Sequence, residues 1–152
     1  MKNSMLLAVC ASVATFATTA IGEVGPNDVA FTDAGAVEVS LTGVAGDPAN
    51  GAAVFKNRKK GNCLACHANS DMSDQLFHGL IGPSLDGVAS RYSEAELRGL
   101  LTNAKNTFDG TMMPAFYVDM GFTRVMKKFD GRTNLTAQEV EDVLAYVQTL
   151  TE

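Results

Sequence analysis

Apolar residues recur at helical spacing in three stretches, and each stretch begins with a helix-start signal. The first runs from Pro48 to about Asn57, with Asp47 as the expected N-cap and proline in the first turn. The second, 93–105, and the third, 136–150, each open with a capping box, a Ser or Thr followed three residues later by Glu. The pattern predicts an all-α domain with three main helices.

The stretches between these helices are rich in Gly, Pro and polar residues, which predicts long loops. Residues 37–41 alternate apolar and polar and indicate a short extended segment. We expect this segment to belong to an N-terminal extension, 23–46, that lies on the domain or on a partner. The folded domain itself is expected to span residues 47–152.

The first 22 residues have the pattern of a cleaved signal peptide. Lys2 gives a positive start, and the uncharged apolar run Met5–Ala17 is too short to span a bilayer comfortably. Small residues follow, so cleavage is expected after about Ala20 or Gly22, with export to the periplasm. An uncleaved membrane anchor is the alternative. Cleavage would also remove Cys10 and leave two cysteines, with no membrane span in the mature chain.

The stretch Cys63-Leu64-Ala65-Cys66-His67 is the strongest chemical signal. It has the spacing of a haem-attachment site, in which two cysteine sulfurs bond one porphyrin edge and the next imidazole ligates the iron. This predicts one covalently bound haem c, held by Cys63 and Cys66 with His67 as an axial ligand. A thioredoxin-like redox pair, a zinc site and a plain disulfide are the alternatives. A thioredoxin-like pair or a plain disulfide would leave the adjacent histidine unexplained. A zinc site would need further Cys or His ligands at matching spacing, which the sequence does not offer.

A second axial ligand is expected from the stretch 106–130, which is mostly loop and contains four methionines. Met113 precedes Pro114, so its backbone is extended and its thioether can project from a fixed loop. Met113 is therefore the predicted ligand, with Met112, His78 and the two later methionines as alternatives. Met120 and Met126 are assigned to core packing, the usual role of methionine. His78 is interpreted as a loop or surface residue, with partner contact as a second option.

The net charge of −5 argues against a nucleic-acid partner and favours a partner protein with a basic surface patch. The 152 residues are enough for one domain with a core.

The motif Cys63-x-x-Cys66-His67, followed by Gly82-Pro83-x-Leu85 and then Met113-Pro114, resembles the pattern of a class I cytochrome c. The resemblance implies that the Pro83 carbonyl accepts a hydrogen bond from the ligating histidine and that Leu85 packs on the haem. It also implies that the first and last helices cross through a glycine and aromatic side chains, here Gly51, Phe55 and Tyr146.

The chain is more closely similar to SoxX-type monohaem cytochromes, which are subunits of the SoxAX complex of bacterial thiosulfate oxidation. The stretches that carry this similarity are 40–43, 46–48, 61–63, Phe77-His78-Gly79, 82–85, 91–92, 106–108, Thr111–Tyr117 and 135–143. Residues 118–134 carry the least of it. The resemblance implies a SoxA-type partner that holds the catalytic haem, where thiosulfate is joined to a carrier-protein cysteine.

The site chemistry agrees with a redox role. Once haem is attached, the mature chain has no free thiol to carry sulfur. If His67 and Met113 both ligate the iron, no coordination position is open to a substrate. We therefore expect an electron-transfer subunit that does not itself catalyse the reaction and passes electrons to an electron-accepting cytochrome. A freestanding electron carrier, and a haem enzyme or sensor with a displaceable methionine, are the alternatives.

Overall fold

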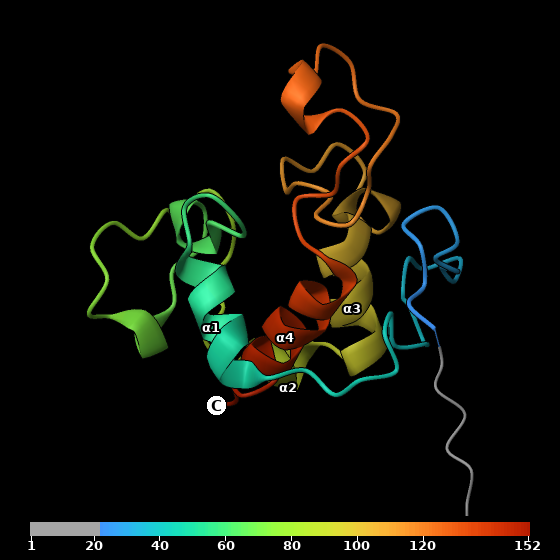
Figure 1. The fold of residues 1–152 in the computed structure, drawn as a ribbon. Helices are drawn as coiled ribbons and strands as arrows, with labels where there is room; N and C mark the ends of the chain where they lie inside the picture. Colours follow the sequence, from blue (N-terminus) through green and yellow to red (C-terminus); the bar gives the residue numbers. More distant parts are fainter. Residues whose placement is uncertain (1–21) are drawn as a thin grey trace, which may run out of the picture.

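The computed structural model describes residues 22–152, and this part of the chain is helical and contains no strand (Figure 1). Nearly all of the predicted signal peptide lies outside the described residues. No helix within residues 22–152 is long and apolar enough to cross a membrane. The α-helices are α1 (Pro48–Lys56), α2 (Val88–Arg91), α3 (Glu94–Asn103) and α4 (Ala137–Val147). Short 3₁₀ turns occupy η1 (Cys63–Ala65), η2 (Ser70–Met72), η3 (Ala104–Asn106) and η4 (Lys127–Phe129).

The three predicted helices are confirmed as α1, α3 and α4, and their start signals act as expected. The side chain of Asp47 accepts a hydrogen bond from the Ala49 N–H at 2.9 Å. Both predicted capping boxes are present, with reciprocal bonds at the starts of α3 and α4. The single-turn helix α2 was not predicted, because four residues are too few to show a helical period.

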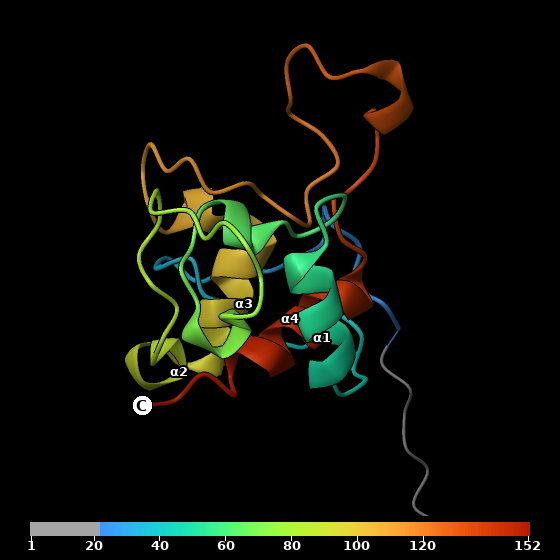
Figure 2. The ribbon, with the colours of Figure 1, turned by 90° about the vertical axis from the view of Figure 1, so that its left-hand side faces the viewer.

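Helices α1 and α4 cross in close contact (Figure 2). A Cβ added at Gly51 would lie 1.9 Å from the carbonyl oxygen of Asp142, so only glycine allows this approach. Beside it, the rings of Phe55 and Tyr146 pack edge to face with centroids 5.3 Å apart. The crossing implied by the family resemblance is therefore confirmed. The core lies around this crossing and continues between α3 and α4.

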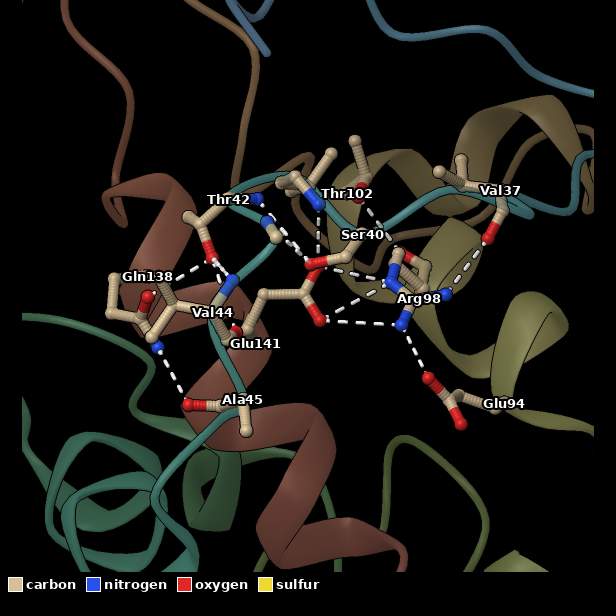
Figure 3. A network of polar contacts seen from close by, with 12 residues as sticks. Val37, Ser40, Thr42, Val44, Ala45, Glu94, Arg98, Thr102, Gln138 and Glu141 are labelled. Atoms are coloured by element: carbon tan, nitrogen blue, oxygen red, sulfur yellow. Dashed lines mark hydrogen bonds and ion pairs between the residues drawn. The ribbon is translucent and has the colours of Figure 1, made fainter. Parts of the chain in front are cut away.

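The N-terminal extension lies on the domain, in contact with α3 and α4. The Val37 N–H donates to the Ala95 carbonyl at 2.9 Å, and Val37 and Leu41 are both buried. Arg98 and Glu141, each almost fully buried, form an ion pair beneath the extension (Figure 3). Arg98 Nη1 donates to the Val37 carbonyl, and Glu141 Oε1 accepts from the Leu41 N–H. The buried charges thus fix the extension to both helices.

The loop 118–134 projects away from the rest of the chain in both views (Figures 1 and 2). Its apolar side chains after Val118 are exposed, and among them Met120 and Met126 have exposed fractions of 60% and 61%. The prediction that these methionines pack in the core is therefore wrong. Gly121, Arg124 and Gly131 in this loop have positive φ angles.

Candidate haem site

The haem-attachment motif forms the single 3₁₀ turn η1 just after α1. The N–H groups of Cys66 and His67 both donate to the Cys63 carbonyl, at 3.1 and 3.0 Å. The turn packs closely against α1, because a Cβ on Gly61 would lie 3.0 Å from the Val54 carbonyl oxygen and 3.1 Å from Cys63 Sγ. Cys63 and Cys66 are not joined in a disulfide and are each partly buried. Both sulfurs are therefore free to bond another group.

A second segment, 79–85, runs alongside the motif and holds its backbone. The N–H groups of Gly79, Gly82 and Leu85 donate to the carbonyls of residues 64, 66 and 68 at 2.8, 2.8 and 2.9 Å. The contact is tight enough to require glycine at position 79, where a Cβ would lie 2.0 Å from the Ala65 carbonyl oxygen. The motif is thus supported by α1 on one side and by this segment on the other.

The imidazole of His67 is fixed in orientation and tautomer. Its Nδ1 lies 2.7 Å from the carbonyl oxygen of Pro83, which can only accept a hydrogen bond. Nδ1 must therefore carry the proton, and the lone pair of Nε2 is left to ligate a metal. A Cβ on Gly82 would lie 2.4 Å from His67 Cε1, so the ring rests directly on this glycine.

The predicted pocket residue Leu85 and the predicted ligand Met113 pack, together with Cys63, against the same core cluster. Met113 is partly buried, whereas its neighbour Met112 has an exposed fraction of 79%. This difference favours Met113 over Met112 as a ligand facing the interior. The assignment of the second ligand stays a prediction.

Lys105, in the turn η3 that follows α3, holds the backbone around Met113. Its Nζ donates to the carbonyls of Thr111 and Met113 at 3.0 and 3.2 Å, and the Met113 N–H donates to Thr111 Oγ1. This support was missed by sequence reasoning, because a single lysine in a polar stretch carries no pattern that links it to a methionine eight residues later.

The structure places His78 half-buried in the loop beside the motif. Its Nδ1 accepts a hydrogen bond from the Asn69 N–H at 3.2 Å, and its Nε2 lies 3.1 Å from the Met72 carbonyl oxygen. Because a carbonyl only accepts, Nε2 is the protonated nitrogen. Both ring nitrogens are thus used within the loop, so the geometry favours a structural loop residue over an iron ligand.

Asn69 is fully buried and links the loop to α4, a role that sequence reasoning also missed. Its Nδ2 donates to the Tyr146 hydroxyl at 2.8 Å, and that hydroxyl donates to Asp71 Oδ2 at 2.8 Å. Burial and the Asp71 carboxylate hold the pKa of Tyr146 well above its usual value. The Asn-x-Asp spacing, with Asn69 Oδ1 accepting from the Asp71 N–H, was the available signal for a structured turn.

Burial raises the pKa of the Cys63 thiol to about 12, although the hydrogen bond involving its own backbone opposes the shift. The thiol therefore stays protonated at neutral pH, unlike the nucleophilic cysteine of a thioredoxin-like pair. Within residues 22–152, no group of three or more His, Cys, Asp and Glu side chains is placed to hold a metal ion. Two unpaired thiols and an imidazole with a free Nε2 instead fit a covalently attached haem.

Comparisons with known proteins agree with this geometry. A sequence model of the cytochrome c family matches residues 48–151. A solved structure described as SoxXA from P. pantotrophus superposes with a TM-score of 0.81 and 44% sequence identity. The match covers 86% of this chain and 100% of that chain. No curated protein sequence was found to match.

Proposed function

Because this chain belongs to the cytochrome c family as a SoxX-type cytochrome, we propose that it is the electron-transfer subunit of a SoxAX-type complex. In this proposal the complex joins thiosulfate oxidatively to a carrier-protein cysteine. The observation that carries the proposal is the fixed imidazole of His67, whose Nδ1 bond to Pro83 leaves Nε2 free beside two unpaired thiols. The family implies that the cofactor is covalently bound haem c.

One haem is proposed, held by thioether bonds from Cys63 and Cys66. His67 and Met113 would ligate its iron, and Pro83 and Leu85 would complete the pocket. When bound, the haem supplies a one-electron iron couple whose potential a methionine ligand raises. The chain's own contribution is to fix both ligands: Pro83 orients the imidazole, and Lys105 holds the loop that carries Met113.

Catalysis is assigned to a SoxA-type partner and not to this chain. With two axial ligands in place, the iron has no open position for thiosulfate. With both cysteines in thioethers, the mature chain has no thiol that could carry sulfur. The electrons are expected to pass from the partner through this haem to an electron-accepting cytochrome.

The proposal includes export to the periplasm, with the signal peptide cleaved after about Ala20 or Gly22. The mature protein then consists of the extension, 23–46, and the cytochrome c domain, 47–152. The many contacts between the extension and helices α3 and α4 support treating both as one folded unit.

Co-expression with a SoxA-type cytochrome, followed by size-exclusion chromatography, tests the proposal. We expect one complex that contains both chains and whose haems are reduced when thiosulfate and carrier protein are added. A chain that stays monomeric beside such a partner, while remaining reducible, would instead be a freestanding electron carrier. Carbon monoxide binding to the reduced parent protein would indicate a displaceable methionine, and hence a sensor or haem enzyme.

A further inference from the structure

Residues 76–81, here called the 76–81 loop, display four large apolar side chains within six residues. The exposed fractions of Leu76, Phe77, Leu80 and Ile81 are 78%, 81%, 87% and 64%. Single exposed apolar residues are ordinary, but a contiguous group of this kind marks an interaction surface.

Neighbouring segments fix the backbone conformation of the 76–81 loop. Between the apolar residues, both ring nitrogens of His78 bond to the backbone of residues 69 and 72. Gly79 is pressed against the Ala65 carbonyl and donates to Leu64. Phe77 has a φ of +66°, a conformation that costs roughly 1 kcal/mol for a bulky residue. The fold thus keeps a strained backbone at an aromatic side chain that the rest of the chain does not cover.

The 76–81 loop lies directly beside the haem-attachment motif. Hydrogen bonds from Gly79, within the loop, to the Leu64 carbonyl and from Gly82, just after it, to the Cys66 carbonyl join this segment to the attachment motif. Electron exchange becomes slower as the distance between cofactors grows, so a redox partner must approach close to this motif. The exposed apolar group is therefore located where such a partner needs to dock.

We propose that the 76–81 loop is the surface through which this chain docks on its SoxA-type subunit. The inference rests on the proposed function and adds the location of the interface. A permanent subunit is the occupant that the chemistry favours, because permanent interfaces are more apolar than the surfaces used for transient encounters. Residues 61–90 contain three aspartates, but basic residues adjoin both ends of this stretch, and Arg91 donates to the carbonyls of Ser84 and Asp86. The charges around the loop are therefore mixed, and the expected complementary surface is defined by its apolar character.

A second exposed apolar region, the projecting loop 118–134, differs in chemistry and serves as a matched control. It carries four basic residues, and the Lys128 ammonium lies 4.7 Å from the centroid of the Phe129 ring. A cation over the ring partly accounts for an exposed phenylalanine without a partner. The two regions lie apart in both views (Figures 1 and 2).

The test measures binding of the purified haem-loaded chain to an immobilised haem-loaded SoxA-type subunit. The test variant is Phe77→Asn with Leu80→Ser, since asparagine tolerates a positive φ and the fold is preserved. The control variant is Met126→Ser with Phe129→Ser, which removes exposed apolar side chains of similar size. Visible spectra of both variants must equal the parent spectrum, which shows that the haem site is intact.

We expect the test variant to bind at least about 100-fold more weakly, as loss of two interface anchors does, and the control to stay within about threefold. A parent that binds while the test variant binds equally well overturns the docking proposal and leaves the proposed function standing. A parent that binds no SoxA-type subunit overturns the proposed function itself. A homodimer of the parent that dissociates in the test variant assigns the loop to a second copy, and this also overturns the proposal.

Discussion

The Nδ1 atom of His67 lies 2.7 Å from the carbonyl oxygen of Pro83, and the same ring rests on Gly82. The dipeptide Gly82-Pro83 therefore sets both the position of the imidazole proton and the orientation of the His67 ring. A backbone carbonyl is a suitable partner, because it only accepts hydrogen bonds and so directs the proton of the neutral imidazole to Nδ1 and the lone pair to Nε2.

Gly82→Ala tests this contact. The added methyl would lie 2.4 Å from Cε1, so the imidazole must move. Overpacking of this kind costs about 1–3 kcal/mol, and we expect a lower thermal midpoint together with an altered visible spectrum. Gly110→Asn is the control, since no atom lies within 4 Å of a Cβ there and asparagine tolerates its positive φ. If Gly82→Ala keeps the parent spectrum and midpoint, the ring does not rest where the structure places it.

Met113→Ala should open one axial position. We expect carbon monoxide binding by the reduced variant and a lower reduction potential, because the methionine ligand that raises the potential is lost. Met112→Ala, at an exposed neighbouring position, should retain the parent's potential and its lack of carbon monoxide binding. The reverse result for the two variants would assign the ligand to Met112.

Lys105→Met should loosen the ligand loop while leaving the ligand itself in place. The variant loses the hydrogen bonds from Nζ to the carbonyls of Thr111 and Met113. A hydrogen bond of this kind contributes about 1 kcal/mol, so exogenous imidazole should displace the methionine with about fivefold higher apparent affinity. Lys59→Met is the control, since this exposed lysine is close to neither carbonyl. Equal imidazole affinity in both variants would show that Lys105 does not stabilise the loop that carries Met113.

The buried pair Arg98–Glu141 should be essential for stability. Arg98→Met leaves an almost fully buried carboxylate without its cation, which costs about 3–5 kcal/mol in the free energy of unfolding measured with denaturant. The double variant Arg98→Met with Glu141→Leu removes both charges and should recover much of the loss. A single variant as stable as the parent would show that the pair does not fix the extension to the domain.

The lowered pKa of the Asp142 carboxyl should make the stability of the fold depend on pH in the acid range. Burial raises the pKa of its carboxyl, but bonds from the Gln138 amide, the Asp47 N–H and the Asn50 amide outweigh burial and hold the pKa below the usual 3.8. The ionised carboxylate therefore stabilises the fold above pH 3.8, and this stability is lost as pH falls through the folded-state pKa. Thermal midpoints of Asp142→Asn should fall less than those of the parent below pH 3.8. Parallel decreases would contradict the assignment.

Sequence reasoning predicted much of this molecule where a local pattern carries the information. Capping boxes and apolar spacing located α1, α3 and α4, and the Cys-x-x-Cys-His spacing located the proposed haem site. It could not predict features that depend on chain segments distant in sequence. The contact between Arg98 and Glu141 joins two helices across 43 residues, and Lys105 supports a loop that has no periodicity. Met120 and Met126 were assigned to the core by residue type alone, and their exposure follows from a loop that turns outward.

The central claim is that one haem is covalently attached through Cys63 and Cys66. Intact mass and the visible spectrum of the exported, purified protein test it most directly. The account predicts the mass of the cleaved chain plus one haem, retained after denaturation, with the spectrum of a low-spin c-type cytochrome. A colourless product with the mass of the polypeptide alone, obtained in cells that attach haem to other cytochromes, would contradict it.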